Sequence, residues 1–406
     1  MDIASFRALE SPAGQALLSE TSGLDVSEDA LLTTASRLRE RHDPALVSAA
    51  LTQVRLRERA RAKFGDDARR MYFTQTGLEQ STRASVASHR ARRFADRLPG
   101  ARVLELGCGI GADLIARARK GLAGEGVELD PLTAEVAKAN ITALGLDDLA
   151  SVRVGDATEE NPDGFDALFA DPGRRTARGR VFDPRSYEPP LDVVLDLARR
   201  VPTACVKVAP GIPHEAVPDG AEAEWVSLGG DVKEAALWLG ALSGDVRRRA
   251  TLLSSDLDPQ MWTLTPQGHD DPDVRAWGRY LYEPDGAVIR AHLVGEVADQ
   301  VGGGLADPHI AYVTSDELRP TPFASAYEVE DVLPFSVKRL RAELRRRGTG
   351  VLTVKKRGSA IDVDRLRRDL GFAGRRAARG APGLTLVLTR VGRDPVALLT
   401  HPVPRG

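Results

Sequence analysis

Apolar positions repeat at helical spacing through the N-terminal quarter of the chain. They recur every three to four residues, with Arg and Glu between them, in Ala30–Arg39 and in Asp43–Ala62. The segment Met71–Leu78 interrupts this pattern, and Ser85–Leu98 resumes it as an Arg-rich helix that a Pro-Gly dipeptide ends. We therefore expect an N-terminal helical domain over residues 1–97.

The spacing of the apolar positions changes after residue 100. Short apolar runs alternate with helix-like stretches, which predicts βαβ units with a parallel sheet and helices on both faces. The predicted strands are Arg102–Leu106, Gly124–Leu129, Ser151–Val154, Ala167–Ala170, Thr203–Val208, Glu224–Leu228 and Ala235–Leu242. Only a Gly-Gly-Asp turn joins the last two, so we expect the sheet to end in an antiparallel hairpin. Residues 98–256 should form this α/β domain.

Helices and strands are mixed from residue 257 onward. We expect helices at Ala287–Ala298, from the N-cap Ser336 to Arg347, and at Val363–Leu370. The strand-like runs are Ile310–Thr314, Ala326–Val332, Val351–Lys355, Leu384–Thr389 and Val396–Leu399. This pattern predicts a small α+β domain over residues 257–406.

The composition excludes several classes of protein. The 406 residues are 42% hydrophobic and 28% charged, which is ordinary for a globular chain and argues against wholesale disorder. The two cysteines, Cys108 and Cys205, are far apart, so neither a disulfide scaffold nor a metal site is expected. No signal-peptide pattern and no run of ~20 apolar residues is present. We expect a soluble, cytoplasmic protein with no membrane association.

Charge is unevenly distributed along the chain. The formal net charge is −2, yet residues 337–380 contain fifteen Lys or Arg and only four Asp or Glu. Clustering of this kind is typical of surfaces that bind polyanions, although an Arg-rich solvated surface would look the same.

A glycine-rich loop follows the first predicted strand. The sequence Val-Leu-Glu-Leu-Gly-Cys-Gly-Ile-Gly places Glu105 two residues before Gly107, with Gly109 and Gly111 after it and a helix beginning at Ala112. Glycines allow a sharp turn and the close approach of a ligand, and the start of a helix favours a negatively charged group. A glycine triplet alone does not identify the ligand, because NAD-binding proteins use one too.

Acidic residues lie at the ends of the next two predicted strands. Glu128 lies 21 residues after Gly107, where an acid can accept hydrogen bonds from both ribose hydroxyls. Asp130 precedes Pro131 and is predicted to cap the next helix. Asp156 follows the third strand, where its carboxylate can accept the amino group of adenine.

These features together resemble class I S-adenosylmethionine-dependent methyltransferases. The loop has the E-x-G-x-G-x-G pattern in place of G-x-G-x-x-G, and the ribose acid, the Gly-Asp-Ala sequence and the terminal hairpin agree with that family over about residues 72–245. The resemblance implies a Rossmann-like, seven-stranded methyltransferase domain. It also implies S-adenosylmethionine as the cofactor, bound by Glu105, the three glycines, Glu128 and Asp156.

The fourth predicted strand is followed by Asp171-Pro172-Gly173-Arg174-Arg175. Amino-methyltransferases have an Asp/Asn-Pro-Pro-aromatic motif at this place, which holds a planar amine and stacks on the base. Asp171 and Pro172 match that motif, whereas Gly173 and Arg174 depart from it. We assign the catalytic role to Asp171, Pro172 and Arg174, because acceptor chemistry belongs at the carboxyl ends of open-sheet strands. Arg174 could stack on a base. The Arg pair could instead clamp a phosphate or carboxylate.

Further candidates lie before and after these motifs. The segment ahead of the glycine loop resembles that of trimethylguanosine synthase-like enzymes, which implies that Phe73, Gln80 and Thr82 cover the cofactor. Phe182 and Tyr187, in a Pro-rich loop, could stack on a base or pack that loop. We interpret His89 as a helix-surface residue.

The whole arrangement also resembles a bacterial methyltransferase family with an N-terminal helical region and a C-terminal THUMP-like domain. The matching sequences are MYFT with GLEQST, LELGCGIGAD, ADPGRR with RVFDP, and YLYEPDGAVIRA. This resemblance and the basic block, the Lys- and Arg-rich residues 337–380, predict a methyltransferase that acts on a base in RNA, either tRNA or rRNA. Two alternatives stay open: a methyltransferase of a small molecule or protein, and a non-catalytic module that binds S-adenosylmethionine and RNA.

Overall fold

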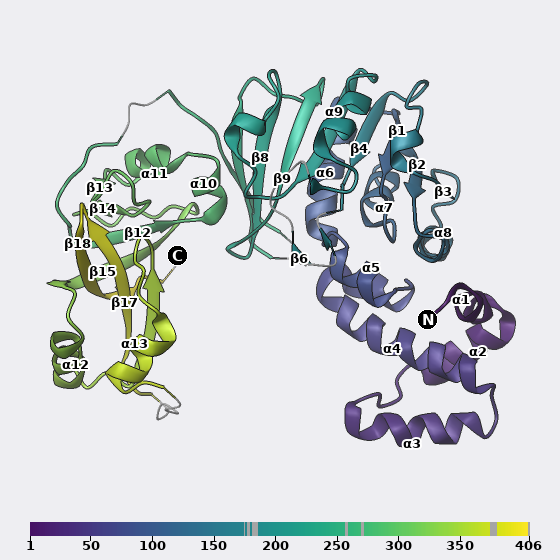
Figure 1. Cartoon of the computed structure of the whole chain (residues 1–406), viewed down its shortest axis with the longest axis horizontal. Helices are drawn as coiled ribbons and strands as arrows, with labels where there is room; N and C mark the ends of the chain where they lie inside the picture. The colour runs from purple at the N-terminus through teal and green to yellow at the C-terminus, as the bar shows by residue number, and fades with distance from the viewer. Residues whose placement is uncertain are drawn as a thin grey trace. The chain divides into compact units, whose positions relative to one another are not determined.

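The computed structural model describes residues 1–173, 175–176, 179–180, 186–255, 259–268, 272–373 and 380–404. Contacts divide the chain into two units (Figure 1). The first comprises Met1–Gly229, Lys233–Arg247 and Leu253–Met261, and the second comprises Gly230–Val232, Arg248–Leu252 and Trp262–Gly406.

Helices form the N-terminal part of the first unit, as the pattern predicts. They are α1 (Ile3–Glu10), α2 (Pro12–Thr21), α3 (Glu28–Arg39), α4 (Pro44–Phe64), η1 (Gly65–Arg69), α5 (Gln75–Gln80) and α6 (Ala84–Arg97). The Asp43 side chain accepts hydrogen bonds from the first turn of α4, and Pro44 occupies the first helical position. Buried residues of these helices, such as Phe6 and Leu17, share one hydrophobic core with Ile110 and Val136. The N-terminal helices are therefore packed against the part of the fold that carries the glycine loop.

A nine-stranded sheet has most of its strands in the first unit. Its strands are β1 (Arg102–Leu106), β2 (Ala123–Glu128), β3 (Ala150–Val154), β4 (Ala167–Ala170), β7 (Thr203–Val208), β8 (Glu222–Leu228), β9 (Asp231–Gly240), β10 (Arg248–Leu253) and β11 (Met261–Leu264), in the order β11-β10-β8-β9-β7-β4-β1-β2-β3. Of these, β10 and β11 lie mostly among residues of the second unit. The strands β3, β2, β1, β4 and β7 are parallel, and β9 runs antiparallel to β7. Connecting helices are α7 (Ala112–Ala118), α8 (Pro131–Leu144) and α9 (Leu191–Ala198), with the short η2 (Ala157–Glu159) and η4 (His214–Ala216). A two-stranded ribbon, β5 (Arg175–Thr176) with β6 (Gly179–Arg180), completes the strands of this unit.

The sheet agrees with the predicted α/β class but has more strands than expected. All seven predicted strands are present, and Gly229 and Gly230 have positive φ in the turn between β8 and β9. Two further strands, β10 and β11, extend the sheet beyond β8. Polar residues after Leu253 separate β10 from β11, and the apolar stretch of each strand is too short to be recognised as a strand in the sequence.

The second unit contains a seven-stranded sheet in the order β13-β14-β12-β15-β18-β17-β16. Its elements are β12 (Tyr280–Pro284), α10 (Gly286–Arg290), α11 (Val294–Gln300), β13 (Gly304–Leu305), β14 (Val313–Ser315), β15 (Ala324–Pro334), α12 (Val337–Arg346), β16 (Val351–Lys356), α13 (Val363–Leu370), β17 (Gly383–Val391) and β18 (Asp394–Pro402). Leucines of α12 and α13, including Leu340 and Leu366, pack with β16, β17 and β18 in one core. Ser336 accepts a hydrogen bond from the Arg339 N–H as the N-cap of α12, as predicted.

One predicted helix of this unit is wrong. The stretch expected as a single helix at Ala287–Ala298 is divided into α10 and α11. His292 lies between them with a φ of 54°, a left-handed conformation that a continuous α-helix does not allow. Within the described ranges, no helix is both long and apolar enough to cross a lipid bilayer.

Candidate active site

The glycine loop is built from left-handed backbone conformations. Gly107, Gly109 and Gly111 have φ of 72°, 55° and 89°, a region that residues with a side chain rarely adopt. A Cβ atom on Gly107 would also lie 3.4 Å from the backbone oxygen of Asp171. The loop therefore needs glycine both for its path and for its close approach to the end of β4.

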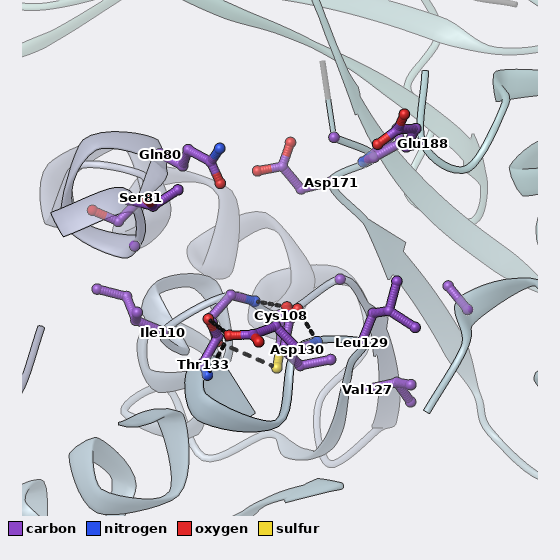
Figure 2. A pocket seen from close by; sticks show the side chains of 18 of the residues that line it. Gln80, Ser81, Cys108, Ile110, Val127, Leu129, Asp130, Thr133, Asp171 and Glu188 are labelled. Carbon is purple, nitrogen blue, oxygen red and sulfur yellow. Dashed lines mark hydrogen bonds between the residues drawn. The ribbon is translucent and has the colours of Figure 1, made fainter. Parts of the chain in front are cut away.

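A cavity of about 960 Å³ lies over this loop (Figure 2). This volume is typical of a small-molecule or cofactor site. Eight of the residues predicted to bind cofactor or acceptor line it: Thr82, Glu105, Gly107, Gly109, Glu128, Asp156, Asp171 and Pro172. The open sheet thus has its cavity where α/β proteins bind ligands, at the carboxyl ends of the parallel strands.

Three predicted residues are not in that lining. Gly111 is the N-cap of α7. Phe73 is fully buried and its ring packs against that of Phe64 in the helical core, so its side chain does not line the cavity. Arg174 lies outside the described residues.

The carboxylate of Glu128 connects the glycine loop to the end of β2. Its Oε2 accepts a hydrogen bond from the Gly109 N–H at 2.8 Å, and its Oε1 accepts one from the Asp130 N–H at 3.1 Å. Asp130 caps α8 by accepting a hydrogen bond from the Thr133 N–H, as predicted. An ionised carboxylate has about four lone-pair sites, so two remain for ligand hydroxyls after these backbone bonds.

Asp156 lies two residues after the end of β3. In the sheet, β1 and β2 separate β3 from β4, which Asp171 follows. Its Oδ1 accepts hydrogen bonds from the Thr158 N–H at 2.8 Å and from the Thr158 hydroxyl at 2.7 Å. The bond from the backbone N–H lowers the pKa of Asp156 below its usual value. The carboxylate is therefore held ionised and fixed, as an acceptor of an amino group should be.

The acceptor motif is held by a lysine to which the sequence pattern assigned no role. Ala170 pairs with Val206 in the parallel β4–β7 ladder, so Asp171 and Lys207 follow side by side. Lys207 Nζ donates to Asp171 Oδ2 at 2.6 Å and to the Thr82 hydroxyl at 2.9 Å. The sequence signal was a single charged residue inside an otherwise apolar strand, which is rarely left without a partner when it is buried.

A buried ion network continues behind Thr82. The Thr82 hydroxyl donates to Asp113 at 2.7 Å, and Arg90 bonds Asp113 at 2.9 Å and also binds Glu234. Burial would raise the pKa of Asp113, but the charges of Arg90 and Lys207 outweigh it and hold this pKa below its usual value. Sequence analysis missed these partners, because Glu234 is 144 residues from Arg90.

Glu105 and the two cysteines are buried. Burial raises the pKa of Glu105 to about 7, although its carboxylate pairs with Arg117. Burial also raises the pKa of the Cys108 thiol well above its usual value, and it raises that of Cys205. Neither thiol is therefore a reactive thiolate.

The segment before α6 forms another part of the cavity wall. Residues 74–77 and 79–82 line it, and Thr74 caps α5 by accepting a hydrogen bond from the Gly77 N–H. Figure 2 shows the Gln80 amide and the Asp171 carboxylate facing one another. The interpretation of this segment as a cover thus has a structural basis in Gln80 and Thr82, whereas Phe73 faces the core.

The remaining candidates are distributed between core and surface. Tyr187 is buried and its hydroxyl accepts a hydrogen bond from the Ala209 N–H at 3.2 Å, so it packs the Pro-rich loop and does not stack on a ligand. Phe182 lies outside the described residues. His89 pairs with Glu224 at 2.9 Å on the half-buried side of α6. Among the described residues, no group of three or more His, Cys, Asp or Glu is arranged to hold a metal ion.

Comparisons with known proteins identify the family and a shared fold. Residues 2–60 match a family model described as a domain of unknown function (DUF8688), and residues 324–402 match the model described as THUMP domain-like. The solved structure of a candidate methyltransferase from Porphyromonas gingivalis W83 covers 99% of this chain and 98% of its own, with a TM-score of 0.71 and 22% identity, which shows a shared fold.

Two curated relatives are closer in sequence. They are named uncharacterized S-adenosylmethionine-dependent methyltransferases, from the CDC 1551 and H37Rv strains of Mycobacterium tuberculosis. Each is 36% identical over 365 residues, which cover 86% of this chain and 94% of the relative. The donor set fits the same cofactor: a glycine cradle, a carboxylate after β2 and another after β3. The chain therefore belongs to the S-adenosylmethionine-dependent methyltransferases and has a THUMP-like domain near its C-terminus.

Proposed function

We propose that this methyltransferase modifies a base in RNA, with Glu128 and Asp156 binding the nucleoside part of the cofactor and Asp171 orienting the acceptor. S-adenosylmethionine supplies an electrophilic methyl group on a positively charged sulfur. The C–S bond breaks as the bond to the acceptor atom forms, and the acceptor then gives up a proton. Alignment of the two reactants can supply roughly 7–11 kcal/mol of the barrier, so positioning dominates and a strong base is not required.

The acceptor end of the cavity supports an N–H or O–H nucleophile. A carboxylate such as Asp171 accepts a hydrogen bond from either group and can take the proton that leaves. Covalent activation of a pyrimidine carbon would need a cysteine thiolate. The chain has two cysteines, and burial raises the pKa of both thiols. We therefore favour a nitrogen or oxygen acceptor over a pyrimidine carbon.

The observation that carries the choice of RNA is a set of unpaired cations on α12 and α13. Part of the basic block is neutralised within the fold, because Arg346 and Arg347 bond Glu343 and Lys355 bonds Glu283. Within the described residues, no ion pair engages five others, namely Lys338, Arg339, Arg345, Arg367 and Arg368. The core-facing sides of both helices carry buried leucines, namely Leu340 and Leu344 on α12 and Leu366 and Leu370 on α13.

Lys338, Arg339, Arg345 and Arg368 are exposed and Arg367 is half-buried, and the charge of Arg368 also acts on Asp362. A group of cations on two neighbouring helices suits a phosphate backbone. Each phosphate that a cation neutralises releases a counterion, so binding should weaken steeply with salt. If all five contact single-stranded RNA, the logarithm of the binding constant should fall with the logarithm of salt concentration with a slope of about −3.5. The match of residues 324–402 to the THUMP-like model supports the same assignment.

The test is methyl transfer from radiolabelled S-adenosylmethionine to total RNA. The RNA comes from a strain that lacks this protein, and nucleoside mass spectrometry locates the methyl group. We expect one methylated nucleoside that is missing from the deletion strain and that the wild-type protein restores, whereas Asp171→Ala does not. Label that enters only protein or small molecules would favour the alternative acceptor. No label in any fraction, despite cofactor binding, would favour a non-catalytic module.

A further inference from the structure

The buried ammonium of Lys207 determines the place of the Asp171 carboxylate. The Lys207 side chain is 6% exposed, whereas that of Asp171 is 24% exposed and lines the cavity. Lys207 Nζ lies 2.6 Å from Asp171 Oδ2. One carboxylate oxygen is thus held inside the protein, and the other is left to the acceptor side.

The ammonium itself is fixed by two further groups. The Thr82 hydroxyl accepts from Lys207 Nζ at 2.9 Å, and Glu234 Oε2 lies 3.9 Å from the same nitrogen. An ammonium has three donor hydrogens; Asp171 and Thr82 accept two of them, and Glu234 adds the attraction of a nearby negative charge. Lys207 therefore has little freedom to follow a moving carboxylate.

The surrounding charges keep this arrangement rigid. Arg90 connects Asp113, which accepts from Thr82, to Glu234, and both the arginine and the two carboxylates are buried. With Asp171 and Lys207, the network contains three carboxylates and two cations, a formal charge of −1. Moving one member out of such a buried network would leave its partner's charge without compensation, which is energetically costly. The network therefore resists rearrangement.

If Lys207 only balanced the negative charge of the nearby carboxylates, it would not need to lie directly beside Asp171. Glu234 is already paired with Arg90, and Asp171 is partly exposed to the cavity. A lysine that only balanced charge could reach either carboxylate from several positions. Here the β4–β7 register places Lys207 directly beside Asp171, so its bond also fixes the rotation of the carboxylate.

We propose that Lys207 is a positioning residue for methyl transfer, which holds Asp171 in the orientation that binds the acceptor. It does not touch the acceptor and acts through Asp171. This inference rests on the proposed role of Asp171, and it adds a residue to which neither the sequence pattern nor the family resemblance gave a function.

The experiment compares Lys207→Met, Lys207→Arg and wild type as full-length proteins. Steady-state methyl transfer to total RNA gives kcat and KM, and calorimetry gives the affinity for S-adenosylhomocysteine. We expect kcat of Lys207→Met to fall by about 100-fold, since a displacement of about 1 Å can have that effect. Cofactor affinity should stay within about threefold, because Lys207 is not part of the cavity lining. Lys207→Arg should recover part of kcat, because a guanidinium can also bond a carboxylate.

Matched controls separate positioning from loss of fold. Lys138→Met removes an exposed lysine of α8 and should leave all three quantities unchanged. Thr82→Val keeps every charge of the network but removes one acceptor of Lys207, so it should lower kcat less than Lys207→Met does. If Lys207→Met does not fold, Thr82→Val decides: an unchanged kcat in this variant overturns the proposal.

Crystal structures of Lys207→Met and wild type provide a readout that needs no RNA. We expect the Asp171 carboxylate to rotate away from its wild-type orientation in the variant. An unmoved Asp171, or an unchanged kcat in Lys207→Met, would overturn the role of Lys207 while leaving RNA methylation standing. If wild type transfers no methyl group to RNA, the proposed function fails, and the orientation of Asp171 still decides whether Lys207 positions it.

Discussion

Glu128 offers the sharpest test of the cofactor site. Its two oxygens bond the backbone N–H groups of Gly109 and Asp130, and two lone-pair sites remain for the ribose hydroxyls. A hydrogen bond to a charged acceptor contributes about 1.5–3 kcal/mol. Loss of two such bonds in Glu128→Ala should therefore weaken binding of S-adenosylmethionine by about 3 kcal/mol or more, a factor of about 100 or more.

The glutamine variant tests whether a carboxylate is needed. Glu128→Gln has one acceptor oxygen, so its NH₂ group must face the N–H of either Gly109 or Asp130. This conflict should move the loop, and we expect at least about tenfold weaker cofactor binding despite the equal size of the side chain. Glu135→Gln changes a half-buried glutamate of α8 that does not line the cavity; it is the matched control and should bind like wild type.

Calorimetry with S-adenosylmethionine and S-adenosylhomocysteine measures these affinities. Thermal unfolding without ligand shows whether the variants are folded, and the same scan with ligand gives a second estimate. Ligand at 100 times its Kd stabilises a protein by about 2.7 kcal/mol, and Glu128→Ala should lose most of this gain. Unchanged affinity in a folded Glu128→Ala protein would refute the assignment of this strand end to the ribose.

Three further predictions concern the acceptor, a buried acid and RNA. Asp171→Ala should lower turnover on RNA by about 100-fold or more while cofactor affinity measured by calorimetry stays within about twofold, and equal losses of both would contradict its role. Burial raises the pKa of Glu105 from 4.5 to about 7, so its stabilising contribution is present below about pH 4.5 and is lost as the pH rises through about 7. In urea unfolding, the stability of wild type relative to Glu105→Gln should therefore decrease by about 2–3 kcal/mol between pH 5 and pH 8, whereas a constant difference would show that Glu105 stays ionised. Replacing both Arg367 and Arg368 by Gln should reduce the salt dependence of RNA binding by about 1.4 in slope, and Arg346→Gln, whose guanidinium is already paired, should change it less.

The backbone around the proposed cofactor site could be predicted because local rules determine it. The positive φ values of Gly107, Gly109 and Gly111 follow from a strand that turns sharply into a helix, and only glycine adopts them readily. Asp130 before Pro131 is a helix start in sequence and in structure. Each of these features needs only a few neighbouring residues, so a single sequence contains the whole signal.

The acceptor half could not be predicted in the same way. Lys207 contacts Asp171 and Thr82, which lie 36 and 125 residues away in the sequence. The contact with Asp171 depends on β4 and β7 being neighbours, and the contact with Thr82 depends on where the segment before α6 packs. In the sequence alone, a lysine near a strand end therefore cannot be distinguished from a surface charge. Aromatic residues were ambiguous for a related reason. Phe73 was expected over the cofactor and Tyr187 could stack or pack; both are buried, because apolar rings fill the core wherever it has room for them.

This difference has a consequence for how the two halves of the site can change. The glycine loop and Glu128 are held by backbone hydrogen bonds, so a variant there should alter cofactor affinity and leave the acceptor end in place. Asp171 is held by side chains from other elements, and replacement of Lys207 should disturb it although Lys207 does not line the cavity. The acceptor specificity of this enzyme should therefore respond to buried charges behind the cavity as much as to the residues that line it.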